Sequence, residues 1–265
     1  DSINAGTYTV TVTGKGNYSG EATEKPTYTI EKATVTPSII SSTTKTYDGT
    51  TAATGLTITL EGVLSGDTVT ATADSYTYNS ANVAEANTVT ANDITLDGAD
   101  AGNYTLSSDT ATANGTITPA ALTVTADAKS KAYGDADPAL TYQVSGLLNG
   151  DTLTGALERD AGENVGSYAI TQGSLDAGDN YTLTFTGANL TITARPVTLS
   201  WSTPTSFTYD GSEHSVTAQV TNKVGNDAFE LTYENNAKTD VGNYTAKVTG
   251  LGNDNYTLTG ATGVE

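Results

Sequence analysis

Cysteine and methionine are absent from the 265-residue chain. Without cysteine the chain forms no disulfide and holds no thiolate-based metal or redox site. Long hydrophobic runs are absent too, because no stretch approaches the roughly 20 apolar residues of a membrane-spanning helix. Apolar side chains also never recur at helical spacing over more than about ten residues. Neither a signal peptide nor an anchoring motif is visible, and Asp1 is not an initiator residue, so we expect the chain to be part of a longer protein.

Positive charge is scarce, with 11 lysines and arginines against 30 aspartates and glutamates and a formal net charge of −19. Such a surface repels nucleic acid and anionic lipid, so we expect neither nucleic-acid binding nor membrane insertion of this segment. Apolar residues make up 36%, below the globular average, which indicates small or repeated cores. The 15 tyrosines and the many threonines favour strands. The composition therefore predicts an all-β protein.

An internal repeat organises the chain. A strand-like segment ends in an isoleucine, and an apolar residue five positions later belongs to the next alternating segment. These isoleucines are Ile30, Ile117 and Ile192. We therefore predict four parts, which are the C-terminal part of a preceding repeat (1–32), two complete domains (33–119 and 120–194) and a domain lacking its last strand (195–265). This last domain would leave an edge open to pairing, and residues 1–32 would complete a strand set with a neighbouring chain or pack as an incomplete cap.

Within each repeat, turn signals separate segments in which apolar and polar residues alternate, as expected for strands joined by hairpins. This pattern predicts tandem small antiparallel β-sandwich domains of the immunoglobulin-like kind, with β-grasp-like domains as the alternative. The one segment with room for a short helix is 137–153. The joints between domains are one or two residues long and cannot swing freely, so we expect an elongated, semi-rigid rod.

A phrase of the form N/D-x-G-x-Y ends in a tyrosine whose hydroxyl can bond back to the backbone and fix a sandwich corner. We predict this structural role for Tyr8, Tyr104, Tyr168 and Tyr244. Stacking on carbohydrate is the alternative, which a buried corner tyrosine would not permit.

A second set of tyrosines opens a tight glycine turn, and its members are Tyr47, Tyr133 and Tyr209. We interpret these turns as structural, with the glycine at positive φ and the aspartate capping the turn. The functional alternative is an exposed, acidic loop used for binding.

Catalytic residues are not evident. The only histidine, His214, has no counterpart in the other repeats, and no nucleophile elbow accompanies it. We therefore predict no enzymatic activity and assign no catalytic, cofactor-binding or metal residue. Calcium at the acidic loops is the one cofactor we consider, although each loop offers at most two close carboxylates. These loops contain Asp97 and Asp100, Asp176 and Asp179, and Asp254 beside Asn253.

Two lysines precede the turn tyrosines by two residues, Lys45 and Lys131, whereas the third domain has Phe207 at that position. A lysine amide cross-link required by every domain would not tolerate phenylalanine, so we interpret the lysines as packing residues. Several Asn-x-Ser/Thr sequons coincide with the repeated Asn-Tyr-Thr step, which explains them without glycosylation. The seven sequons of the chain begin at Asn17, Asn103, Asn114, Asn180, Asn189, Asn243 and Asn255.

The motif strings together resemble known repeats. Tyr47-Asp-Gly, Asp97-Gly-Ala-Asp-Ala-Gly-Asn-Tyr and Gly115-Thr-Ile-Thr-Pro-Ala resemble the YDG repeats of large bacterial surface proteins. Lys131-Ala-Tyr-Gly-Asp-Ala-Asp-Pro and Asn164-Val-Gly-Ser-Tyr resemble the associated MBG repeats of the YGX type. The tail and the third domain, with Tyr209-Asp-Gly-Ser-Glu-His, look like a further MBG variant.

This resemblance implies tandem domains in secreted, adhesin-like or filament-like proteins at the bacterial cell surface. We expect a non-catalytic structural stalk or adhesion segment, whose partners are neighbouring repeats and other copies in head-to-tail contact. The alternatives are a module that binds a glycan or protein ligand, and an accessory arm of an extracellular enzyme. In the domain 33–119, Asn82-Val-Ala-Glu-Ala stands where N-x-G-x-Y is expected, so we expect its middle strand to run differently.

Overall fold

The computed structural model describes residues 4–40, 42–148, 150–259 and 263–264. Its regular structure there consists of strands and one short 3₁₀ helix, Ala101–Asn103, which confirms the all-β prediction. The described part of 137–153 holds a strand, β14 (Tyr142–Ser145), rather than a helix. No α-helix occurs among the described residues, so nothing there supplies the helix that packs on a β-grasp sheet.

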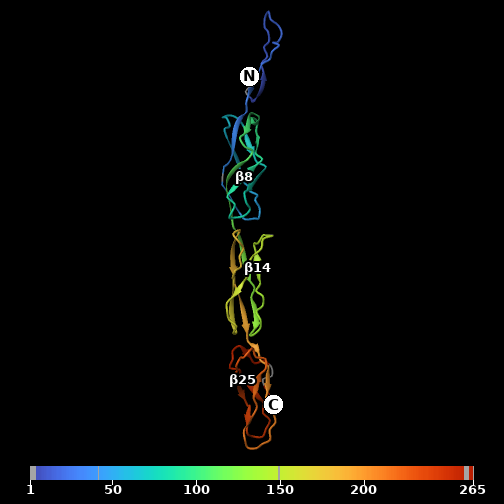
Figure 1. Ribbon diagram of the computed structural model, residues 1–265, viewed down its shortest axis with the longest axis vertical. Helices are drawn as coiled ribbons and strands as arrows, with labels where there is room; N and C mark the ends of the chain where they lie inside the picture. The colour runs from blue at the N-terminus through green and yellow to red at the C-terminus, as the bar shows by residue number, and fades with distance from the viewer. Residues whose placement is uncertain (1–3, 41, 149, 260–262, 265) are drawn as a thin grey trace. The chain divides into compact units, whose positions relative to one another are not determined.

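The chain forms two compact units. Unit 1 comprises Asp1–Leu122, Gly146–Asp151 and Ala177–Thr182, and unit 2 comprises Thr123–Ser145, Thr152–Asp176 and Leu183–Glu265. The division passes through the domain predicted at 120–194. Figure 1 labels β8, β14 and β25, one strand from each of the three sets of sheets described below.

Unit 1 begins with a hairpin of β1 (Gly6–Thr9) and β2 (Thr27–Ile30). The two strands pair antiparallel, with Tyr8 opposite Tyr28 and Gly6 opposite Ile30. The two tyrosine rings stack at a centroid distance of 5.5 Å. In the described residues these two strands form a sheet of their own.

The rest of unit 1 contains two main sheets around one core. One sheet has the order β10-β3-β5, with bounds Tyr104–Leu106, Ala33–Ile39 and Ile58–Glu61. The other has the order β4-β11-β8-β7, with bounds Thr43–Thr46, Ala111–Thr118, Thr88–Asn92 and Ser75–Tyr78. A short pair, β6 (Thr70–Thr72) and β9 (Thr95–Asp97), completes the set. Residues of both main sheets form the core, led by Ile58, Ala91 and Ala111.

The opening strand of this sandwich is divided between the two sheets. Its first part, β3, pairs parallel with β10, and its second part, β4, pairs parallel with β11. These parallel pairs were not predicted from the sequence, which indicated hairpins alone.

In unit 2 the same arrangement recurs. β13 (Lys129–Ala132) pairs parallel with β18 (Ala188–Thr193), which pairs antiparallel with β16 (Gly166–Thr171). β15 (Glu158–Arg159) borders β16. The second sheet has the order β14-β12-β17, in which β12 (Ala120–Ala126) and β17 (Tyr181–Thr186) begin in unit 1 and end in unit 2. The unit 2 core contains Val124, Ile170 and Leu190.

The final sandwich of unit 2 is built from shorter strands. β19 (Arg195–Pro196) pairs parallel with β26 (Tyr256–Thr257), and β20 (Leu199–Trp201) pairs with β22 (Ala218–Val220). β21 (His214–Ser215) pairs with β24 (Ala237–Lys238). The last sheet has the order β23-β25-β27, with bounds Thr232–Glu234, Ala246–Gly250 and Gly263–Val264.

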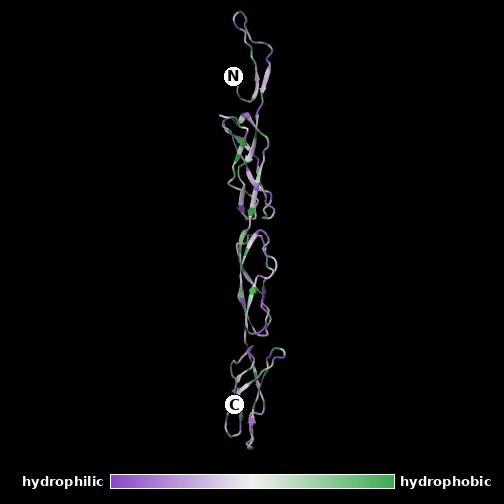
Figure 2. Ribbon diagram, turned by 90° about the vertical axis from the view of Figure 1, so that its left-hand side faces the viewer, coloured by the Kyte–Doolittle hydropathy of each residue, from purple (hydrophilic) through white to green (hydrophobic). Residues whose placement is uncertain are grey.

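Burial alternates along the longer strands, as in the buried and exposed succession of β12. Figure 2 shows the same feature as short apolar segments interrupted by polar ones. No helix of the described residues is long and apolar enough to cross a membrane.

Candidate functional site

The most regular contacts of the molecule lie where one predicted domain meets the next, and each joint falls within a single unit. An asparagine from the repeated Asn-Tyr step forms hydrogen bonds to a turn of the preceding segment through both the oxygen and the nitrogen of its side-chain amide. These asparagines are Asn103, Asn180 and Asn255. We call each such contact an asparagine clamp.

In each clamp the Oδ1 atom accepts a hydrogen bond from a backbone N–H, at 2.8 to 2.9 Å. The donors are Ala5, Val83 and Val165. The Nδ2 atom donates to the Oδ1 atom of the asparagine just before that donor, at 3.0 to 3.1 Å. These acceptors are Asn4, Asn82 and Asn164. One geometry therefore recurs at three successive joints, although its partners lie more than 90 residues apart in the chain.

Asn82 and Val83 take part although their phrase departs from the N-x-G-x-Y pattern. The strand that follows, β8, pairs antiparallel with β11 as β16 does with β18. The clamp and the strand pairing are thus the same in both domains, but β8 begins six residues after Asn82 and β16 only two after Asn164, so the segment before the strand does run differently.

A carboxylate shared by two tyrosines is the second element of the joint in unit 1. Tyr181 donates its hydroxyl to Asp151 at 2.5 Å, and Tyr47 donates to the same oxygen at 3.0 Å. The two rings meet edge to face at 5.4 Å. The Tyr181 hydroxyl also accepts the N–H of Leu148, so both of its hydrogen-bonding roles are used.

The joint in unit 2 repeats this arrangement. Tyr256 donates to Asp227 at 2.6 Å and accepts the N–H of Val224 at 2.7 Å. The ring of Tyr133 meets that of Tyr256 edge to face at 5.4 Å, and its hydroxyl lies against the same aspartate. Arg195 adds a bond from its Nε atom to the carbonyl of Tyr133, at 2.7 Å.

Burial and the nearby carboxylate both keep the joint tyrosines in their neutral form. Burial is the larger cause of the raised pKa of Tyr47, Tyr133, Tyr181 and Tyr256, and the hydrogen bond to Asp151 or Asp227 is the next. A neutral tyrosine donates its proton to a carboxylate, whereas a tyrosinate would repel it. The joints therefore require protonated tyrosines.

Glycine is required where the turn of one domain meets the next. Gly134 has a φ of 80°, and a Cβ atom there would lie 2.3 Å from a methyl carbon of Val224. Gly211 stands two residues after its turn tyrosine rather than one and has a φ of 78°, but a Cβ atom there would meet nothing within 4 Å. The turn prediction is thus confirmed by the positive φ, and close packing explains the glycine at Gly134 further.

The aspartates of these turns are paired with cations or cap their own turns. Asp48 accepts from Lys45 at 2.7 Å and from the N–H of Thr50. Asp135 pairs with Arg195. Asp210, in the third domain, accepts the N–H of Ser212.

The corner prediction holds for three of its four tyrosines. The hydroxyls of Tyr8, Tyr168 and Tyr244 donate to the carbonyl four residues upstream, at 2.7 to 3.3 Å. Their rings are half-buried or exposed rather than buried, and cations lie over two of them, Arg159 over Tyr168 and Lys238 over Tyr244.

For Tyr104 the corner prediction is wrong. Its hydroxyl donates to Asp67 at 2.5 Å and accepts the N–H of Leu64, as Tyr181 and Tyr256 do in their joints. It is 2% exposed, because it belongs to the Asn-Tyr step rather than to a corner. The hydrogen bond to Asp67 raises the pKa of its phenol.

The two lysines considered for cross-links, Lys45 and Lys131, both form ion pairs, and Lys45 pairs with Asp48. Lys131 is buried and bonds Asp137 at 2.7 Å and Glu163 at 2.6 Å, and Arg159 pairs with the same two carboxylates. We call these four residues the ion cluster. Its cations lower the pKa of both carboxyls, and its carboxylates raise that of Lys131. Amide formation needs a neutral amine and a protonated carboxyl, so this arrangement opposes it.

In the acidic loops, carboxylates accept hydrogen bonds from backbone N–H groups. Asp97 accepts the N–H of Gly98, and Asp100 accepts that of Thr68. Among the described residues there is no group of three or more metal-ligating side chains of histidine, cysteine, aspartate or glutamate. His214 lies 3.1 Å from Asp210 and stacks on Phe207.

Three of the sequon asparagines, those at positions 103, 180 and 255, are the clamp residues. Their amide nitrogens are engaged, which gives them a structural use in the fold. The one signal in the sequence is the Asn-Tyr step, which recurs at all three positions, whereas the clamp partners lie more than 90 residues away.

Comparison with protein-family models found two matches. Residues 30–113 match the YDG domain, and residues 122–191 match the MBG domain of the YGX type. The comparisons with curated proteins and with solved structures gave no match. The chain therefore carries a YDG domain followed by an MBG domain of the YGX type, as its motifs predicted.

Proposed function

We propose that this chain is a non-catalytic structural segment of a bacterial cell-surface or extracellular filament protein, in which tandem β domains act as a stalk. The observation that carries the proposal is the recurrence of one clamp geometry at three joints. Domains joined only by a flexible linker would not need this repeated asparagine clamp.

The chemistry of the joints supports a load-bearing role. Each of the two complete joints combines two bonds of an asparagine amide with a tyrosine hydroxyl that donates to a carboxylate, and in the unit 1 joint a second tyrosine donates to the same carboxylate. Bonds to a charged acceptor are worth about 1.5–3 kcal/mol each, and neutral ones about 1 kcal/mol. In tandem repeats such interface contributions add to the stability of the single domains.

The experiment is small-angle X-ray scattering of the chain and of the double variant Tyr47→Phe/Asn180→Ala. A stalk predicts that the wild-type curve fits a single conformation at low and high salt, and that the variant requires an ensemble. A wild-type curve that already requires the same ensemble as the variant would contradict the proposal.

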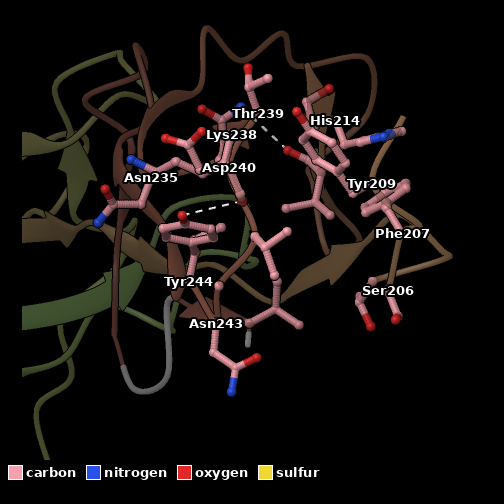
Figure 3. Close-up of a pocket in the computed structure, with 18 residues that line it drawn as sticks. Ser206, Phe207, Tyr209, His214, Asn235, Lys238, Thr239, Asp240, Asn243 and Tyr244 are labelled. Atoms are coloured by element: carbon pink, nitrogen blue, oxygen red, sulfur yellow. Dashed lines mark hydrogen bonds between the residues drawn. The ribbon is translucent and has the colours of Figure 1, made fainter. Parts of the chain in front are cut away.

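A glycan- or protein-binding module is the alternative, favoured by the exposed aromatic side chains around a hollow in the third domain (Figure 3). A glycan array probed with the whole chain separates the two functions. Reproducible binding that Phe207→Ala abolishes would support the alternative, whereas an array without binding supports the stalk.

A further inference from the structure

In each of the first two domains, the second part of the opening strand lies beside the closing strand and runs in the same direction. β4 pairs parallel with β11, and β13 pairs parallel with β18. β11 and β18 are the last strands of their domains, and each is separated from the first strand of the next domain by a single residue. We call each of these parallel pairs a terminal strand pair.

Parallel order decides how a terminal strand pair responds to tension along the chain. The pull draws the opening strand toward its N-terminal end and the closing strand toward its C-terminal end. The two strands are then forced to slide lengthwise. Because the hydrogen bonds of a parallel pair are evenly spaced along it, all of them carry the load together. A pair that is pulled apart from one end loses the same bonds one after another, at a lower force.

Both terminal strand pairs have a lysine at the same register position of the opening strand. Lys45 lies opposite Ile117, and Lys131 lies opposite Ile192. The ammonium group of Lys131 lies inside the ion cluster, where it bonds Glu163 at 2.6 Å. Glu163 stands shortly before β16, which borders β18 on the side away from β13. The ion cluster therefore connects β13 to a segment outside the pair.

Lys45 is held by oxygen atoms of the segment that follows β4. Its Nζ atom donates to Asp48 at 2.7 Å, and to the carbonyl oxygens of Thr50 at 2.7 Å and Ala52 at 3.0 Å. Ala52 forms an antiparallel bridge with Thr77 of β7, the strand at the far edge of the same sheet. In both domains the lysine thus connects the opening strand to a part of the domain other than the closing strand.

A threonine of the closing strand adds two bonds at the C-terminal end of each pair. Its hydroxyl donates to the carbonyl of the lysine, at 3.3 Å in the first domain and 3.2 Å in the second. Its carbonyl accepts the N–H of the turn tyrosine, at 2.8 Å and 2.9 Å. The residues are Thr118, Lys45 and Tyr47 in the first domain, and Thr193, Lys131 and Tyr133 in the second.

We propose that the terminal strand pair, anchored by its lysine, is the tension-bearing element of each of these two domains. A domain under load then unfolds only after this pair has slid apart. The inference rests on the proposed stalk function, because a stalk is pulled along its length. It goes beyond that function by locating the resistance within each domain rather than at the joints.

Pulling the second domain in two directions with optical tweezers tests the proposal. Because the chain has no cysteine, DNA handles can be attached to pairs of introduced cysteines in the otherwise unchanged chain. Ala128→Cys with Ala194→Cys pulls β13 from its beginning and β18 from its end, so the pair slides. Ala128→Cys with Thr186→Cys pulls both strands from their beginnings, so the same pair opens from one end.

We expect the sliding direction to need at least about twofold more force, because forced unfolding is governed by the barrier to unfolding. Lys131→Met keeps the apolar stem, leaves both carboxylates paired with Arg159, and should lower the force in the sliding direction alone. Thr193→Val, which removes only the hydroxyl bond, should do the same and replaces Lys131→Met if that variant does not fold. The matched control is Ile170→Val, a buried change in β16 outside the pair, which should lower both forces equally.

Equal forces in the two directions would overturn the proposal, as would a control that lowers the force in the sliding direction as selectively as the lysine and threonine variants. Either result leaves the scattering test of the stalk unaffected, because that test depends on the joints. A wild-type chain that scatters as an ensemble would contradict the stalk and leave the direction dependence of a single domain unchanged.

Discussion

Removing the ring of Tyr133 tests the idea that a joint stabilises the domain beyond it. Tyr133 lies outside the third domain as predicted, yet it packs on the core of that domain, against Tyr256 and Val224. Trp201, the only tryptophan, belongs to the same core and packs on Tyr233. Its fluorescence therefore reports the unfolding of the third domain in urea.

The expected magnitude follows from the contacts. An edge-to-face aromatic pair contributes about 0.5–1.5 kcal/mol beyond the burial of area, and burial of a half-buried ring adds roughly 1–1.5 kcal/mol. The contact with Asp227 adds about 1 kcal/mol. Tyr133→Ala should thus lower the free energy of unfolding seen by Trp201 by about 3 kcal/mol, and Tyr133→Phe by about 1 kcal/mol.

The matched control is Tyr209→Ala, which removes the corresponding tyrosine of the third domain itself. That side chain is mostly exposed, so we expect a loss below about 0.5 kcal/mol at concentrations where the chain is monomeric. An unchanged urea midpoint for Tyr133→Ala, or an equal loss for Tyr209→Ala, would refute the reasoning.

Three further predictions concern the clamp, the turn and pH. Asn180→Ala should speed amide exchange at Val83 about tenfold, through loss of roughly 1.4 kcal/mol of hydrogen bonding, whereas Asn114→Ala, on the exposed face of β11, should leave it unchanged; equal rates in both would count against the clamp. Gly134→Ala should lower the melting temperature more than Gly211→Ala, because both add the cost of positive φ (about 1–2 kcal/mol) but only the first also meets a valine; similar shifts would show that the close packing is unimportant. Stability should fall below about pH 4, because the ion cluster lowers the folded-state pKa of Asp137 and Glu163 and its contribution is lost as the pH falls through those values. Stability should also fall above about pH 10, because the joint tyrosines have a raised pKa in the folded state and the unfolded state therefore deprotonates first. A urea midpoint unchanged at both extremes would contradict this.

The sequence predicted those parts of the fold that depend on local patterns. Alternation gave the all-β class, glycine-aspartate turns appear where the turn signals stand, and three corner tyrosines bond four residues upstream. Tyr104 shows the limit, because it has the spacing of a corner but a hydroxyl directed to Asp67. Sequence spacing predicts the position of a tyrosine in a turn, but the hydrogen-bond partner of its hydroxyl depends on the residues packed around it.

The joints could not be derived by the same reasoning, because their bonds connect residues more than 90 positions apart. Asn180 looked like a turn or sequon residue, and nothing local distinguishes it from an exposed asparagine such as Asn114. The parallel pairing of the divided opening strand was missed for a similar reason. Ile40, the first residue after β3, reads as a continuation of one alternating strand, although β3 and β4 belong to different sheets.

Amide hydrogen exchange of the unmodified chain tests the central claim most directly, because the molecule contains its own control. The N–H groups of Ala5, Val83 and Val165 each donate to a clamp asparagine. Val241 stands three residues before Tyr244, as Val165 stands before Tyr168, but it is 83% exposed and donates to no clamp asparagine among the described residues. With the chain monomeric, we predict slow exchange at the first three and exchange near the unprotected rate at Val241. Exchange at one common rate for all four would contradict the account.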